Sequence, residues 1–119
     1  MTASSAAAFQ DGLAAAQAGD FERALAIART LIGRNPNDVH AYQLIGTVKF
    51  SQGRNLEALE AFVRANRIVP NQPAILNWIG VLMKERGDFA QARSAFSRAV
   101  QFAPQSAEYL CNLGETLAL

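Results

Sequence analysis

The chain has 119 residues, with 11 Lys and Arg against 10 Asp and Glu, one Cys and one His. A chain of this length builds about one domain with a modest core, so we expect a single domain over residues 1–119. The net charge of +1 gives no basic surface for nucleic acid. One Cys and one His cannot supply the four ligands of a structural zinc site. We therefore expect no nucleic-acid partner, no metal and no other cofactor.

Alanine is the most informative residue type in the composition, since it occurs 23 times. It is the best helix former, so the composition favours helices over strands. No stretch reaches the roughly 18 uninterrupted apolar residues of a membrane span, and the first ten residues lack the basic start of a secretory signal. We predict a cytoplasmic protein without a membrane partner, and the excess of arginine and alanine is typical of a bacterial source.

Proline, glycine and alanine recur with a period of 34 residues. The series are Pro36, Pro70 and Pro104; Gly12, Gly46, Gly80 and Gly114; Gly19, Gly53 and Gly87; and Ala24, Ala58 and Ala92. A fixed period in this range indicates stacked structural repeats, none of which can bury its apolar face alone.

Each period has the pattern helix, turn, helix. In the third period one apolar helix face is formed by Ile75, Leu76, Ile79, Leu82 and Met83. Gly87 is expected to end that helix, and Asp88 to cap the next one by accepting a hydrogen bond from a free backbone amide. Pro104 prevents the second helix from continuing. The sequence predicts seven helices, in chain order 5–18, 21–34, 39–52, 55–68, 73–86, 89–102 and 107–118.

The residues at these periodic positions form recurring motifs. They are Tyr42-x-x-Ile45-Gly46, Leu76-x-x-Ile79-Gly80-x-x-Met83 and Leu110-x-x-Leu113-Gly114-x-x-Leu117, followed by Ala58-x-x-x-Phe62 and Ala92-x-x-x-Phe96. With the three prolines, these motifs resemble the tetratricopeptide repeat (TPR) family over nearly the whole chain. The resemblance implies an all-α fold, a right-handed superhelical α-solenoid of three helix-turn-helix repeats plus a C-terminal helix. The repeats would span 5–38, 39–72 and 73–106, and the final helix 107–119.

Both ends of the array depart from the family pattern. The first repeat has Ala8, Asp11 and Ala28 where later repeats carry larger apolar residues, so we interpret it as an N-terminal cap. The final helix is either a solvating cap or the first half of a fourth repeat, and its ending without Lys, Arg or a closing Gly favours the second alternative. Its exposed apolar flank would also allow a homodimer through the C-terminal helix.

The sequence offers little chemistry for catalysis. His40 and Cys111 are the only residues of their kinds, and two repeats between them imply a separation on the order of 20 Å. No glycine-rich phosphate loop, G-x-S-x-G or H-E-x-x-H motif is present. We therefore predict that the chain is not an enzyme. The arginines mostly lie near helix C-termini, where they complement the helix dipole; the alternative is an anion-binding stripe that includes Arg64 and Arg98.

In the TPR family the first helix of each repeat lines a concave groove. The repeat register maps the partner-binding groove onto Phe9, Leu13, His40, Gln43, Thr47, Phe50, Asn77, Trp78, Val81, Lys84 and Cys111, with Glu85, Glu108 and Glu115 beside them. The apolar members could hold side chains of a peptide, and the polar members could bond its backbone or a carboxylate. The alternative is that some of these residues only pack against neighbouring helices.

The resemblance implies a protein-protein interaction scaffold that binds a peptide or helix of a partner protein in this groove. Family members that bind the acidic tails of heat-shock chaperones use a clamp of Lys, Asn and Arg, but the matching positions here are Phe9, Leu13, Leu44, Ala74 and Trp78. A co-chaperone role of that kind is therefore not expected. Two alternatives stay open, an N-terminal docking region of a larger glycosyltransferase-like or sulfotransferase-like enzyme, and a self-associating structural module.

Overall fold

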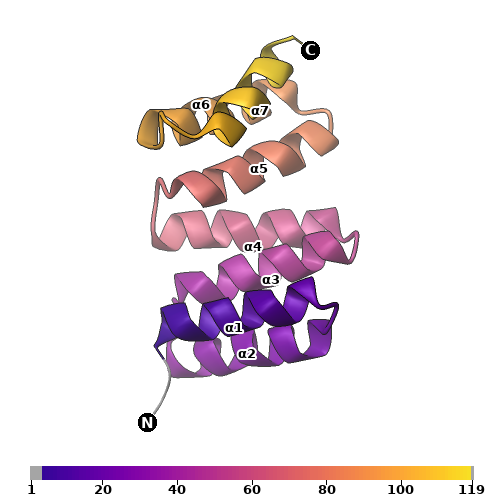
Figure 1. Cartoon of the computed structure of the whole chain (residues 1–119), viewed down its shortest axis with the longest axis vertical. Coiled ribbons are helices and arrows are strands. Elements are labelled where there is room, and N and C mark those ends of the chain that lie inside the picture. Colours follow the sequence, from indigo (N-terminus) through magenta and orange to yellow (C-terminus); the bar gives the residue numbers. More distant parts are fainter. Residues whose placement is uncertain (1–3, 119) are drawn as a thin grey trace. The chain divides into compact units, whose positions relative to one another are not determined.

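A computed structural model of the chain describes residues 4–118. Within this range the chain forms seven α-helices and no strand: α1 (Ser5–Gln17), α2 (Phe21–Arg34), α3 (Val39–Ser51), α4 (Asn55–Ile68), α5 (Pro73–Glu85), α6 (Phe89–Phe102) and α7 (Ala107–Leu117) (Figure 1). Each predicted helix is present, with both ends within one residue of the prediction. The all-α fold of paired helices is therefore confirmed, while the right-handed superhelical winding stays a prediction.

The helices form two compact units, divided between Ile68 and Val69. The first contains α1 to α4, in which α2 packs on α1 and α3, α1 lies beside α3, and α4 packs on α3. The second contains α5 to α7, in which α6 packs between its two neighbours in sequence and α7 also touches α5. The assignment of residues 1–119 to a single domain stays a prediction. None of the described helices has both the length and the apolar character needed to cross a bilayer.

The glycines between paired helices end the first helix of each pair. Gly19, Gly53 and Gly87 have φ values of 82°, 76° and 84°, a left-handed conformation that only a residue without a Cβ adopts at little cost. The turn predicted from these glycines is thus confirmed. In the turn between α4 and α5, Asn71 also has a positive φ, of 67°, and asparagine is one of the few residues other than glycine that adopt this conformation.

Four helices begin with a side-chain cap, at Ser4, Asp20, Asp38 and Ser106. Each of these accepts a hydrogen bond from a backbone amide three residues later, at 3.0 to 3.3 Å. The expected cap at Asp88 is wrong, because its side chain makes no such bond to α6. Its carboxylate lies 3.5 Å from Nε of Arg86 instead, so the preceding guanidinium takes the place of the helix amides.

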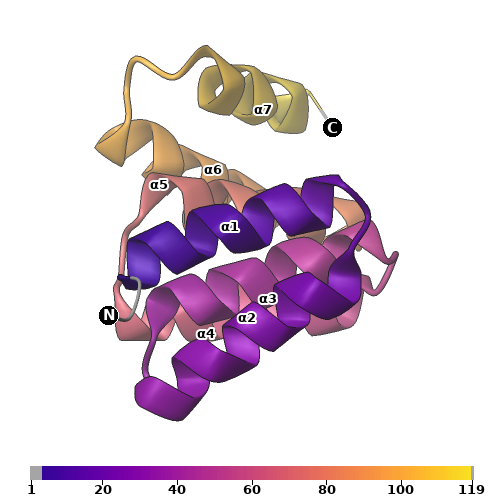
Figure 2. The ribbon, with the colours of Figure 1, turned by 60° about the horizontal axis from the view of Figure 1, so that its bottom comes forward.

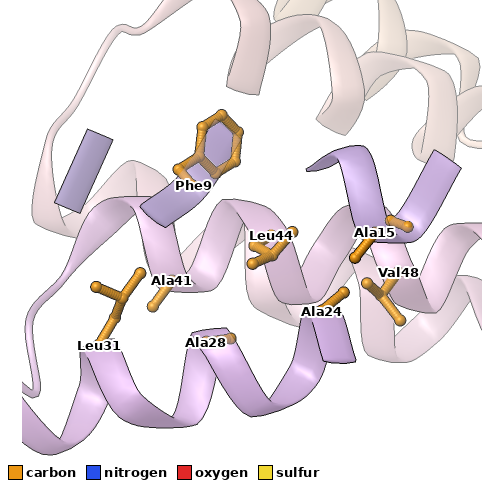
Figure 3. Packing of buried hydrophobic residues seen from close by; sticks show 9 residues of the cluster. Phe9, Ala15, Ala24, Ala28, Leu31, Ala41, Leu44 and Val48 are labelled. Carbon is orange, nitrogen blue, oxygen red and sulfur yellow. The ribbon is translucent and has the colours of Figure 1, made fainter. Parts of the chain in front are cut away.

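In the first unit, the core contains buried residues of α1, α2 and α3 (Figure 3). A Cβ added at Gly12 would lie 2.3 Å from the side chain of Leu44. In the next repeat the equivalent glycine, Gly46, is covered by the ring of Phe62. In the first repeat the residue equivalent to Phe62 is the small Ala28. The space beside Gly12 is filled instead by Leu44, which comes from the following repeat. This explains how a degenerate first repeat still has a closed core.

A glycine and a phenylalanine mark the helix crossing in both units. A Cβ at Gly46 would lie 2.6 Å from the Phe62 ring, and a Cβ at Gly80 would lie 2.5 Å from the Phe96 ring. Both rings are buried, with 0% and 1% of their surface exposed. Helix axes can approach this closely only where one helix has no side chain at the contact. The two glycines are therefore required by packing.

Candidate protein-binding site

The first-helix face of the first unit is formed by α1 and α3, which lie side by side (Figure 2). The hydroxyl of Ser5 donates to the Asp38 carboxylate, at 2.9 and 2.8 Å from its two oxygens, and lies 2.8 Å from Nδ1 of His40. The ring of His40 also contacts that of Phe9, with the centroids 5.5 Å apart. These contacts attach the start of α1 to the start of α3.

The Ser5, His40 and Asp38 side chains do not form a catalytic triad. In a triad the imidazole stands between the serine and the carboxylate, so that it can take the serine proton while the carboxylate orients it. Here the serine stands between the other two residues, and its hydroxyl donates a hydrogen bond to the Asp38 carboxylate. Asp38 also accepts the Ala41 amide at 3.0 Å as the cap of α3. The cluster therefore orders two helix starts.

Further along this face the predicted groove residues differ in exposure. Phe9 is only 8% exposed and belongs to the core cluster, with Leu13 packed against it. Half-buried positions on α3 are occupied by His40, Gln43, Thr47 and Phe50, and the Thr47 hydroxyl donates to the Gln43 carbonyl at 3.0 Å. The surface that a partner could touch in this unit is therefore mainly on α3.

An ion pair links α3 to α4 near one end of this face. Nζ of Lys49 lies 3.1 Å from Oε2 of Glu57, and the guanidinium of Arg54 lies 3.7 Å from the same oxygen. The hydrogen bond from Lys49, assisted by the charges of both cations, holds the pKa of Glu57 below its ordinary value. The carboxylate therefore stays ionised to a lower pH than an ordinary glutamate does.

In the second unit, polar pairs connect the two first helices α5 and α7. The amide of Asn112 donates to Oδ1 of Asn77 at 2.8 Å, and Nζ of Lys84 lies 3.3 Å from Oε2 of Glu115. The thiol of Cys111 lies 3.6 Å from the other oxygen of Glu115. Asn77 is buried, so its side chain serves this contact between helices.

The other predicted residues of the second unit lie nearer the surface. Trp78, Val81 and Lys84 are half-buried, and Glu85, Glu108, Cys111 and Glu115 are exposed. Next to them on α7, burial raises the pKa of the Tyr109 phenol, and the negative charge of Glu108 adds to the effect. This face combines an aromatic ring, an aliphatic side chain and a lysine, each partly accessible.

The structure therefore gathers the predicted residues into two sets, one in each unit. His40 belongs to the first set and Cys111 to the second. Sequence reasoning did not identify Ser5 and Asn112 as the partners of His40 and Asn77. Each pair is 35 residues apart, one more than the repeat period, so a search at that spacing on first helices would have found both.

The arginines of the alternative anion stripe have neighbours of their own. The guanidinium of Arg64 stacks over the ring of Tyr42, 4.8 Å from its centroid. Arg98 donates to the side-chain oxygen of Asn71. Among residues 4–118, no three His, Cys, Asp or Glu side chains come together as ligands for a metal ion.

Comparison with known proteins agrees with this geometry. Two family models, each described as a tetratricopeptide repeat, match residues 9–73 and 49–112. The chain belongs to the tetratricopeptide repeat family.

One related sequence is the CTR9 homolog of Arabidopsis thaliana, which is 32% identical over 97 residues. The match covers 81% of this chain but 9% of that protein, so the chain spans less than a tenth of the length of this relative. The likeness is thus confined to a short part of a much longer polypeptide.

Several solved structures share the fold. A thermophilic TPR protein of Thermus thermophilus has a TM-score of 0.81 at 18% identity, over 95% of this chain and 63% of that one. A complex of Naa15 and Naa10 bound to HypK gives 0.80 at 20% identity, over 94% and 17%. The type III secretion chaperone SycD of Yersinia enterocolitica, in complex with a peptide of the translocator YopD, gives 0.79 at 14% identity, over 93% and 90%.

Proposed function

We propose that this chain is a protein-interaction module that holds a peptide segment or helix of a partner protein on its first-helix faces. The observation that carries the proposal is the same in both units. Two first helices lie in contact and leave partly accessible apolar and polar side chains together, such as Phe50 with Gln43 and Val81 with Lys84. A mixture of this kind suits a peptide, which presents side chains and backbone polar groups in alternation.

The chemistry of the exposed groups defines how a partner segment would be held. The half-buried Phe50, Trp78 and Val81 offer apolar contact to its side chains, and such contacts supply most of the binding energy at peptide interfaces. The Gln43 amide can donate to a backbone carbonyl and accept from a backbone amide. The SycD chaperone, which shares this fold, has been solved with a bound peptide, and this supports the proposal. In this proposal the chain has no catalytic role and acts in the cytoplasm.

The test is affinity capture with substitutions on these faces. We compare the wild-type chain with a triple variant, Gln43→Ala, Phe50→Ala and Val81→Ala, all at partly exposed positions. A matched control carries Arg29→Ala, Glu60→Ala and Arg93→Ala, at exposed positions on second helices. Circular dichroism confirms that all three proteins are folded. A protein captured by the wild type and the control but lost from the first variant supports the proposal, whereas capture of the same proteins by all three contradicts it.

A further inference from the structure

The hydrogen-bond cluster at the starts of α1 and α3 determines which ring nitrogen of His40 carries hydrogen. Oγ of Ser5 lies 2.9 and 2.8 Å from the two carboxylate oxygens of Asp38 and 2.8 Å from Nδ1 of His40. A serine hydroxyl has one hydrogen to donate, whereas an ionised carboxylate only accepts. The hydroxyl hydrogen therefore points to Asp38, and Oγ of Ser5 accepts a hydrogen bond from Nδ1–H of His40.

Asp38 is held as an acceptor by its surroundings. Its Oδ1 accepts the Ala41 amide at 3.0 Å in the first turn of α3, where the free amides of a helix start favour a negative charge. With 8% of its surface exposed, the carboxylate depends on the Ala41 amide and the Ser5 hydroxyl for its hydrogen bonds. The hydroxyl therefore cannot turn towards His40 without leaving a buried oxygen unsatisfied.

The second ring nitrogen of His40, Nε2, is left with a lone pair. In a neutral imidazole one nitrogen donates and the other accepts, so Nδ1–H leaves Nε2 as an acceptor. Within residues 4–118, the ring has no hydrogen bond besides the one to Ser5, and no buried side-chain nitrogen or oxygen lacks a partner. Nε2 therefore belongs to the accessible part of this half-buried residue.

We propose that Nε2 of His40 is a hydrogen-bond acceptor for the partner segment and selects an N–H group of that segment, from its backbone or from a side chain. This inference rests on the proposed function, since it assigns a role within the same first-helix face. Ser5 is a positioning residue in this role, because it fixes the ring hydrogen on Nδ1. The Asp38 carboxylate polarises the Ser5 hydroxyl, and the chain of hydrogen bonds strengthens the acceptor at Nε2.

The neighbouring groups explain why this nitrogen can discriminate between partners. Gln43 lies one turn along α3 on the same side as His40, and its amide can donate or accept. Nε2 of the neutral ring cannot change roles, because Ser5 fixes the hydrogen on Nδ1 and the Phe9 ring packs against the imidazole, with the centroids 5.5 Å apart. A carbonyl or carboxylate oxygen of a partner would meet a lone pair at Nε2 and be disfavoured.

The first test is the ¹⁵N NMR spectrum of the untagged chain, in which His40 is the only histidine. Long-range ¹H–¹⁵N correlations distinguish a ring nitrogen that carries hydrogen from one that has a lone pair. The pH is raised until the ring signals stop changing, so that the neutral ring is observed. We expect hydrogen on Nδ1 in the wild type. Ser5→Ala removes the acceptor and should move the hydrogen to Nε2, the form that predominates in free histidine.

Two further variants separate this role of Ser5 from a merely structural one. Ser5→Thr keeps the hydroxyl and should keep the hydrogen on Nδ1. Ser4→Ala removes the neighbouring hydroxyl, which accepts the Ala7 amide as the cap of α1, and it should also leave the His40 ring unchanged. Hydrogen on Nε2 in the wild type overturns the proposal, as does hydrogen that stays on Nδ1 in Ser5→Ala.

Binding is tested with peptides selected on the wild-type chain from a random library displayed on phage. Peptides that are lost with Gln43→Ala occupy this face, and their affinities are measured by fluorescence anisotropy. Ser5→Ala places hydrogen on Nε2, and His40→Asn has an amide that can replace Nδ1 but no acceptor at the position of Nε2. Each should bind these peptides at least about tenfold more weakly than the wild type, whereas Ser5→Thr should bind them equally well.

The outcomes separate this inference from the proposed function. If no selected peptide requires Gln43, the proposed function fails and the acceptor role fails with it. If peptides require Gln43 but bind Ser5→Ala or His40→Asn as tightly as the wild type, the proposed function stands and only the acceptor role is overturned. Tenfold losses in both variants, with wild-type binding by Ser5→Thr, support the acceptor role.

Discussion

The helices α5 and α7 have nearly the same pattern of apolar residues and differ in what packs on them. Leucine at the same position of the repeat is 2% exposed in α5 and 47% exposed in α7. A Cβ added at the glycine four residues later would lie 2.5 Å from the Phe96 ring in α5, and in α7 it would have no atom of any other described helix within 4 Å. The difference shows that a TPR motif specifies a surface suited to a covering helix. Whether that surface is buried depends on whether another helix packs on it.

The largest effect is expected when the ring that covers α5 is removed. Phe96→Ala should lower the free energy of unfolding by about 3–5 kcal/mol, because it leaves a cavity beside Gly80. Urea denaturation followed by circular dichroism measures the change. Phe102→Ala on the same helix is the control, since that side chain is 47% exposed, and it should cost less than about 1 kcal/mol. Equal losses from the two substitutions would mean that Phe96 is not part of the packing.

The contrast between α5 and α7 can also be tested at two equivalent leucines, one on each helix. Leu76→Ala removes a buried side chain and should cost about 2–4 kcal/mol, whereas Leu110→Ala removes an exposed one and should cost about 0.5 kcal/mol or less. Both proteins are measured by the same urea titration. A large loss for Leu110→Ala would show that α7 is covered in solution, and the contrast between the two helices would then be wrong.

The ion pair between α5 and α7 should contribute a smaller amount. Lys84 and Glu115 are 34% and 58% exposed, so Lys84→Ala should cost about 0.2–1 kcal/mol, and added salt should reduce that loss. A double-mutant cycle with Glu115→Ala isolates the pair from other effects of each side chain. A coupling free energy near zero at low salt would indicate that the pair is not formed in solution.

The smallest effect concerns pH and the ion pair between α3 and α4. Because Lys49 lowers the pKa of Glu57 in the folded chain, the pair stabilises the fold above the ordinary glutamate pKa. That contribution is lost as the pH falls through the lowered pKa. Glu57→Gln should therefore reduce the urea midpoint slightly at neutral pH and not in strong acid. An equal reduction at both pH values would contradict the assignment.

Much of the fold could be predicted from the sequence because the periodic residues act locally. A glycine such as Gly53 ends a helix through its own φ value, and a proline such as Pro104 stops one through its ring, so the helix bounds did not require a knowledge of packing. Contacts between repeats were harder to predict. Leu44 fills the space beside Gly12 because Ala28 is small, and this depends on side-chain volumes in two different repeats.

The candidate site was predicted less completely for the same reason. The repeat register identifies which helix side a residue occupies, but Phe9 and Asn77 are buried on that side by contacts with the next first helix. Asp88 illustrates a local failure, since its carboxylate pairs with Arg86 in place of the helix amides. The assignment of the remaining residues to a partner-binding surface stays a prediction.

The contrast between a covered and an uncovered first helix is tested most directly by adding one methyl group to each glycine. Gly80→Ala should lower the free energy of unfolding by about 1–3 kcal/mol, because the new Cβ would lie 2.5 Å from the Phe96 ring. Gly114→Ala should leave it unchanged or raise it by up to about 1 kcal/mol, since alanine is the better helix former and the site is open. A similar loss in both variants would contradict the contrast between the two helices.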